Sequence, residues 1–119
     1  MDIKMALKKK VYLASPYSNP DPAIQKQRFY AVCKKAGEIM SLGFLVYSPI
    51  AHSHPIAKIC NLPKDYKYWQ KVNHEFIEWA DEVWILMLPG WEYSAGIKDE
   101  ISFSESLGKA VRFLIWEKI

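Results

Sequence analysis

The sequence has few of the features that define several large classes of protein. Only Cys33 and Cys60 of its 119 residues are cysteine, too few for a disulfide-stabilised secreted domain. No apolar run approaches the roughly 18 residues of a membrane span, and no stretch resembles a secretory signal peptide. The sequence therefore predicts a reduced cytoplasmic protein with no membrane partner.

An excess of charge and the common cofactor motifs are also missing. The 16 basic and 13 acidic residues give a net charge of +3, too small to favour a nucleic-acid partner. Pro89 and Gly90 are followed neither by a dinucleotide-binding glycine pattern nor by a P-loop lysine. His52 and His54 are close in sequence, but no ligand cluster at suitable spacing completes a metal site. We expect no cofactor and no metal.

The length of the chain indicates one domain, residues 1–119. It is short for an enzyme that must also enclose its substrate, so a second subunit would help to complete a site. Five tryptophans and seven tyrosines provide apolar surface that another copy could cover. We therefore expect a homo-oligomer, a dimer or larger.

Short apolar runs bounded by turn residues alternate with segments of helical periodicity. Helices are expected from Asp21 to Gly43, after Pro63, and from Ser94 to Gly108. Residues 48–63 are the least regular, with one short helix at 56–60. The order predicts a small α/β sandwich with a mostly parallel sheet of four or five strands and helices on both faces. The predicted strands are residues 10–14, 44–47, 83–87 and 110–116.

The loop after the third predicted strand gives the clearest functional signal. A tight Pro89-Gly90 turn leads to Ser94, which is placed to cap the next helix. Ligands of open α/β folds bind at the carboxyl ends of the strands, where this loop should lie. Glu100, about one and a half turns into the helix, should point from the buried edge toward that crevice.

The helix after Pro63 carries a polar residue on its apolar side. Trp69, Val72, Phe76 and Ala80 are expected to form a buried stripe, and Asn73 falls inside it. A buried polar side chain needs a partner or a cavity. Asn73 therefore either bonds a neighbouring loop carbonyl or faces a site.

Three short motifs occur in order along almost the whole chain: Tyr-Leu-Ala-Ser-Pro-Tyr at 12–17, Ala-Asp-Glu-Val at 80–83, and Ser94-Ala-Gly96 with Glu100 four residues after the glycine. Together they resemble the nucleoside 2-deoxyribosyltransferase superfamily. Residues 53–55 and 88–91 most resemble a small bacterial and phage branch of unassigned function. The resemblance implies a Rossmann-like or flavodoxin-like fold, cleavage of the N-glycosidic bond between deoxyribose and a base, and active sites often shared across a homodimer.

The resemblance also implies roles for two residues of the last helix. Glu100 matches the nucleophilic glutamate, which attacks or stabilises the developing positive charge at the anomeric carbon. Its alternative is an exposed glutamate that pairs with Lys98 or with the neighbourhood of Lys109. Ser94 stands where the family's nucleotide hydrolases use serine on the phosphate, at a helix N-terminus that favours an anion. A nucleotide is therefore favoured over a nucleoside, although Ser94 could be a cap alone.

The sequence departs from the family at the residue eight positions before Asp81. The family places an aspartate there to handle the proton of the leaving base, and this chain has Asn73. An amide can hydrogen-bond a base but cannot act as a general acid. Either His74, Glu75 or a partner subunit substitutes for it, or the protein is a non-catalytic nucleotide-binding module that has lost its general acid. Asp81 itself is expected to end a structural element.

Our leading hypothesis is N-glycosidic bond cleavage or transfer on a nucleotide, a nucleoside or a related N-riboside. Trp91 and Tyr93 are interpreted either as base-stacking or as core residues. Glu100 and Asn73 are the expected catalytic residues. The expected substrate-binding residues are Tyr12, Ser15, Pro16, Tyr17, Ser18, His54, Gly90, Trp91, Ser94 and Gly96.

Overall fold

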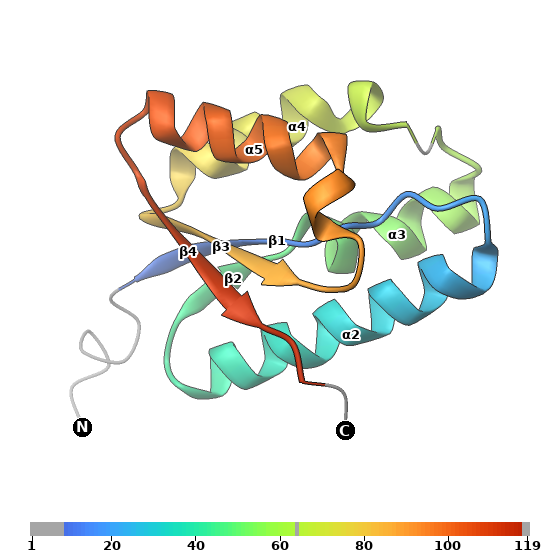
Figure 1. Ribbon diagram of the computed structural model, residues 1–119, viewed down its shortest axis with the longest axis horizontal. Helices are drawn as coiled ribbons and strands as arrows, with labels where there is room; N and C mark the ends of the chain where they lie inside the picture. Colours follow the sequence, from blue (N-terminus) through green and yellow to red (C-terminus); the bar gives the residue numbers. More distant parts are fainter. Residues whose placement is uncertain (1–8, 64, 118–119) are drawn as a thin grey trace.

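The computed structural model describes residues 9–63 and 65–117, which form one parallel sheet between two layers of helices (Figure 1). The strand order is β2-β1-β3-β4, and each neighbouring pair is parallel. This confirms the predicted α/β sandwich. The strands are β1 (Lys10–Ala14), β2 (Leu45–Tyr47), β3 (Glu82–Met87) and β4 (Ala110–Ile115).

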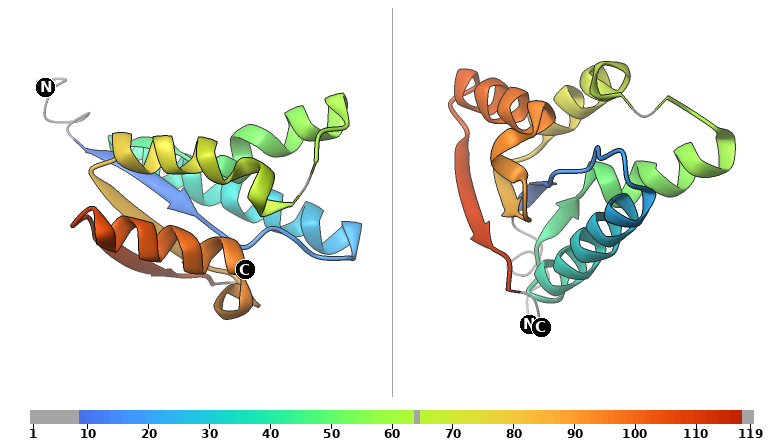
Figure 2. Two further views of the ribbon diagram at one scale, coloured as in Figure 1. Left: turned by 90° about the horizontal axis from the view of Figure 1, so that it is seen from above. Right: turned by 45° about the vertical axis from the view of Figure 1, so that its right-hand side comes forward.

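Two helices cover each face of the sheet. Helices α4 and α5 lie over one face, while α2 lies across the other, with α3 packed beside α2 (Figures 1 and 2). No helix within 9–63 and 65–117 is long and apolar enough to cross a membrane. The helices are α2 (Pro22–Ser41), α3 (Pro49–Cys60), α4 (Tyr66–Trp79) and α5 (Ala95–Ser106), and a single 3₁₀ turn, η1 (Trp91–Tyr93), precedes α5.

The helix boundaries follow the predicted capping residues. Asp21 accepts a hydrogen bond from Ala23 N at 2.9 Å, and Pro22 occupies the first turn of α2. Ser94 Oγ accepts from Ile97 N at 3.2 Å and caps α5. Because Ser94 also follows the loop after β3, capping fixes the start of α5 beside the carboxyl end of the sheet.

Helix α3 is longer than predicted. It covers Pro49–Cys60 rather than 56–60 alone, because Ser48 caps it through Ala51 N at 3.1 Å and Pro49 stands in its first turn. Pro55 lies inside the helix, where proline normally costs about 3 kcal/mol. Packing of α3 against α2 and β1 outweighs this local cost, and Asn61 ends the helix in the left-handed conformation.

The core consists of two clusters that share the sheet as a wall. Tyr12 points into the cluster under α4 and α5, while its neighbour Leu13 points into the cluster over α2. Successive side chains of a strand point to opposite faces of the sheet, and helices cover both faces. The central strands are therefore apolar on both faces.

The predicted stripe on α4 is displaced by about one residue. Asn73 and Ile77 are its buried residues, whereas Val72 is 41% exposed. Ala80, just after the helix, is buried as expected, and Trp69 and Phe76 are half-buried. Asn73 therefore lies at the centre of the face that packs on the sheet.

Candidate functional site

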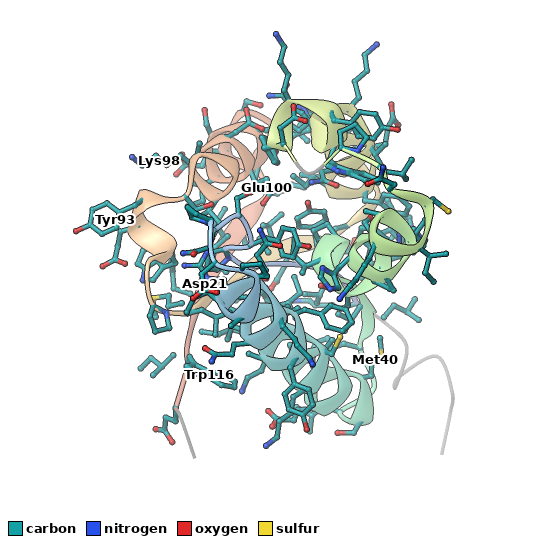
Figure 3. The ribbon with its side chains drawn as sticks, turned by 90° about the vertical axis from the view of Figure 1, so that its right-hand side faces the viewer. Asp21, Met40, Tyr93, Lys98, Glu100 and Trp116 are labelled. Atoms are coloured by element: carbon teal, nitrogen blue, oxygen red, sulfur yellow. The ribbon has the colours of Figure 1, made fainter. Side chains whose placement is uncertain are left out.

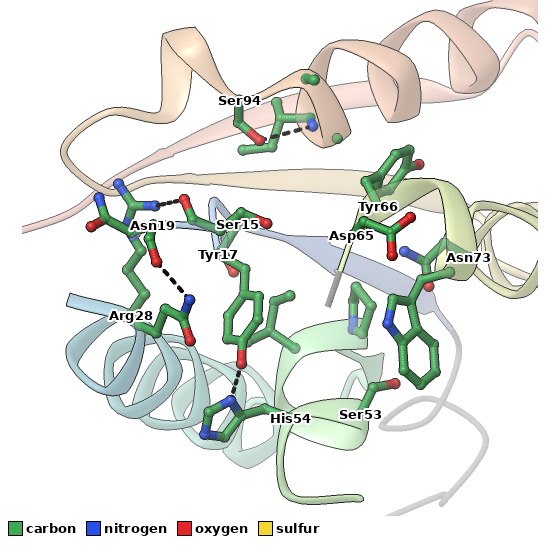
Figure 4. Close-up of a pocket in the computed structure, with 18 of the residues that line it drawn as sticks. Ser15, Tyr17, Asn19, Arg28, Ser53, His54, Asp65, Tyr66, Asn73 and Ser94 are labelled. Carbon is green, nitrogen blue, oxygen red and sulfur yellow. Dashed lines mark hydrogen bonds between the residues drawn. The ribbon is translucent and has the colours of Figure 1, made fainter. Parts of the chain in front are cut away.

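A cavity of about 870 Å³ opens at the carboxyl ends of the strands (Figure 4). Its walls come from the loops after β1 and β3 and from residues of α2, α3, α4 and α5. This is the edge at which parallel α/β folds bind their ligands. The predicted site residues that line it are Ser15, Tyr17, Ser18, His54, Asn73, Gly90, Ser94, Gly96 and Glu100.

Three predicted substrate-binding residues do not line this cavity. Tyr12 is fully buried, and Pro16, in the loop after β1, is also fully buried. Trp91 packs against the core, with its ring 5.6 Å from that of Phe113. Of the two aromatic residues after the Pro-Gly turn, Tyr93 lines the cavity and Trp91 belongs to the core.

Glu100 is a buried carboxylate held through one oxygen. Its side chain lies on the inner side of α5, while Lys98 and Tyr93 point outward (Figure 3). Oε2 accepts from Tyr12 Oη at 2.7 Å, from Asn73 Nδ2 at 3.2 Å and from Tyr66 Oη at 3.4 Å. The interpretation of Glu100 as an exposed partner of Lys98 is wrong, because only 4% of it is exposed.

The surroundings of Glu100 act on its ionisation in opposite directions. Burial raises its pKa to about 7, although hydrogen bonds from Tyr12 and Asn73 favour the charged form. The carboxylate and the protonated acid are therefore both populated near neutral pH. A carboxyl group with such a pKa beside a cavity is typical of a functional site.

The other carboxylate near Glu100, Asp99, is held in its ionised form by its own hydrogen bonds. Asp99 accepts from His74 Nε2 and Tyr66 Oη, each at 2.7 Å, and from Gln70 Nε2 at 3.1 Å. Burial raises the pKa of Asp99, but these hydrogen bonds outweigh it and leave the pKa below its ordinary value. Asp99 is thus a stable anion that orients Tyr66 toward Glu100.

Neither proposed substitute for the general acid lies in the cavity. His74 is engaged by Asp99 and stacks on Phe103 with ring centroids 3.8 Å apart. Glu75 is exposed, and neither residue lines the cavity. Asp81 has the expected structural role, since its carboxylate accepts from Lys10 N at 2.9 Å and joins the starts of β1 and β3.

The positions of two glycines are explained by residues that the sequence did not reveal. A Cβ on Gly96 would lie 3.0 Å from Cδ1 of Tyr66, so glycine allows the Tyr66 ring to lie against the start of α5. Gly90 has φ +91°, and a Cβ there would lie 2.8 Å from Arg28 Nη2. Both glycines therefore make room for cavity-lining side chains.

Arg28 ties together the two loops that border the cavity. Its guanidinium donates to Ser18 O and to Pro89 O, each at 3.0 Å. Tyr17 and His54 are hydrogen-bonded through Oη and Nδ1, which connects the first loop to α3. His54 lies in α3, outside the short helix predicted at 56–60.

Two buried polar atoms of cavity-lining residues have no hydrogen-bond partner within 9–63 and 65–117. They are Ser15 Oγ and Asn73 Oδ1. Asn73 does not bond a loop carbonyl with its side-chain nitrogen, which instead contacts Glu100. Within those same ranges, no group of three or more histidine, cysteine, aspartate or glutamate residues could hold a metal ion.

The parallel sandwich with a cavity at its strand ends is the Rossmann-like or flavodoxin-like fold of the deoxyribosyltransferases. The chain is similar in structure to a 2-deoxyribosyltransferase from the psychrotolerant bacterium Bacillus psychrosaccharolyticus, with a TM-score of 0.61 and 26% sequence identity. The similarity covers 92% of this chain and 76% of that one, and it supports a relationship to the superfamily.

The family itself follows from the sequence match. Residues 9–118 match the family described as a domain of unknown function (DUF1937), and the chain belongs to that family. No curated protein matches the sequence significantly. The finer assignment to a bacterial and phage branch stays a prediction.

Proposed function

We propose that the protein cleaves or transfers the N-glycosidic bond of a nucleotide or a related N-riboside, with Glu100 as the nucleophile. The observation that carries the proposal is a buried carboxylate at the wall of a cavity, whose hydrogen bonds to other described residues all reach Oε2. The similarity to a 2-deoxyribosyltransferase supports a substrate with a nucleoside unit.

The hydrogen bonds to Glu100 suit it to attack a sugar carbon. Tyr12 and Asn73 occupy Oε2, so Oε1 is the oxygen that attacks the anomeric carbon. As the C–O bond forms, the C–N bond breaks and its electron pair leaves with the base. Water or a second base then takes the sugar, and Tyr12 stabilises the carboxylate that is released.

The two ends of the cavity differ in chemistry, which supports a nucleotide with its phosphate at one end. Arg28 and Ser94 lie at one end, while Tyr66 and Asn73 lie at the other (Figure 4). At the first end, the Arg28 guanidinium and the N-terminus of α5 favour an anion. The aromatic end, where Trp69 also lines the wall, receives the base.

Protonation of the leaving base requires a group other than Asn73, because an amide is not a general acid. Asp65 lines the aromatic end, and its side chain makes no capping hydrogen bond on α4. We assign this proton transfer to Asp65. We also propose that a second copy of the chain covers the exposed Tyr93 beside the cavity.

The experiment is to incubate the protein with nucleosides and nucleotides of each common base and to separate free base by chromatography. Wild type should release base, and Glu100→Ala should not. Glu105→Ala, on the exposed side of the same helix, is the matched control and should remain active. Ligand binding without base release, in wild type and in Asn73→Asp, would instead indicate a non-catalytic module.

A further inference from the structure

The two ends of the Asn73 amide have different partners. Nδ2 donates to Glu100 Oε2 at 3.2 Å, whereas Oδ1 is buried without a hydrogen-bond partner among the described residues. The whole residue is only 5% exposed and lines the cavity. A buried acceptor without a donor is unfavourable, so a bound ligand that supplies a donor would be favoured there.

The charge on Glu100 fixes which way this amide faces. An ionised carboxylate only accepts hydrogen bonds, so it selects the orientation in which Nδ2 points toward it. In the reversed orientation Oδ1 would face Oε2, and two acceptors would repel each other. When Glu100 is ionised and ready to attack, one N–H of Asn73 is held by its carboxylate, and Oδ1 is the acceptor that has no donor among the described residues.

The neighbouring side chains at the same end of the cavity have their donors occupied. Tyr66 Oη donates to Asp99, and Trp69 Nε1 donates to Pro63 O at 2.8 Å. The unpaired Asn73 Oδ1 therefore suits a base edge that carries an N–H donor.

Resting on the proposed function, we infer that Asn73 selects bases with an exocyclic amino group over bases with a carbonyl at the same position. An amino group donates to Oδ1 and leaves Nδ2 on Glu100. A carbonyl at the same position faces Oδ1 as a second acceptor and leaves it unpaired, and turning the amide to meet the carbonyl would take Nδ2 away from Glu100. The substrate class is therefore adenine or cytosine nucleotides, and their deaminated counterparts are rejected.

The expected difference in kcat/KM between amino and carbonyl bases follows from the cost of leaving a buried polar group unpaired. Sites built to hydrogen-bond a substrate group reject the analogue that lacks it by large factors, and here the nucleophile is also affected. We expect kcat/KM to differ by roughly a hundredfold within each pair of bases.

The test compares kcat/KM for 2'-deoxyadenosine with 2'-deoxyinosine 5'-phosphate, and for 2'-deoxycytidine with 2'-deoxyuridine 5'-phosphate. In Asn73→Ala both members of a pair should react slowly, at rates within about threefold of each other, because neither finds a partner. Asn73→Asp should also narrow the ratio, since a protonated carboxyl can donate as well as accept. The matched control Asn61→Asp makes the same change at an exposed cap of α3 and should keep the wild-type ratio.

The outcomes separate this inference from the function on which it rests. Thermal melting checks the fold of each variant, and Asn73→Ala decides the test if Asn73→Asp does not fold. Equal rates within each pair for wild type, or a preference that persists in Asn73→Ala, overturn the inference while the function stands. If no base is released from any nucleotide, the proposed function fails and the inference fails with it.

Discussion

Replacing Glu100 with glutamine should stabilise the protein at neutral and alkaline pH. The folded-state pKa of Glu100 is about 7, compared with 4.5 for the unperturbed side chain. Between these values the folded protein holds a proton that the unfolded chain has released, so the free energy of unfolding falls as pH rises. Glutamine removes this dependence, and its side-chain oxygen still accepts a hydrogen bond from Tyr12.

The size of the effect follows from the displacement of the pKa. Below pH 4.5 the side chain is protonated in both states, and the two proteins should differ little. The gain from Glu100→Gln should then grow by about 1.4 kcal/mol per pH unit and level off above pH 7 at about 3 kcal/mol. For a domain of this size, that corresponds to roughly 10 °C in Tm.

Denaturant unfolding followed by tryptophan fluorescence, from pH 4 to pH 9, measures this difference. Glu105→Gln is the control on the same helix, and its effect should be small and independent of pH because its side chain is exposed. Glu100→Gln should also abolish base release, so one substitution would both raise stability and remove activity. A Glu100→Gln difference that stays constant with pH, or a less stable variant at pH 8, would refute the account of the buried carboxyl.

Three further variants test the packing and the ion pairs. Gly96→Ala should displace the Tyr66 ring and lower kcat/KM. Its control is Gly37→Ala, because a Cβ at Gly37 would meet nothing within 4 Å. Gly37→Ala should raise stability by roughly 0.5–1 kcal/mol and leave kcat/KM unchanged. Glu82→Gln loses ion pairs to Arg112 and Lys9, whose hydrogen bonds lower the pKa of Glu82 to about 2. Glu82→Gln should therefore lower the free energy of unfolding, measured with urea, by its full amount above pH 4.5, and this loss should disappear as pH falls toward 2. An unchanged free energy of unfolding at pH 7 would contradict the assigned ion pairs.

The regular elements could be predicted because their signals are local. Strand β1 matches its predicted range, and capping at Asp21 and Ser94 depends only on adjacent residues. Helix α3 could not be predicted in full, because Pro49 and Pro55 are signs of irregular structure in sequence. Its length is set by packing on α2 and β1, which lie elsewhere in the chain.

The contrast between local signals and long-range packing also explains which parts of the site could be predicted. The spacing of Ser94, Gly96 and Glu100 placed these residues at one cavity, because they belong to a single loop and helix. Arg28 and Tyr66 have no such motif, and only the folded chain brings them beside Gly90 and Gly96. The Asp99 hydrogen-bond cluster was missed for this reason as well, since its partners lie on a different helix.

The partners Tyr12 and Glu100 are 88 positions apart in the chain. A ribosome that has synthesised the first 90 residues has already produced three strands of the sheet but not Glu100. Contacts between such distant segments form late, so docking of the last helix is the step that withdraws this charge from water. A polypeptide that terminates before that helix would lack β4 and its pairing with β3 as well as the carboxylate that we propose as nucleophile.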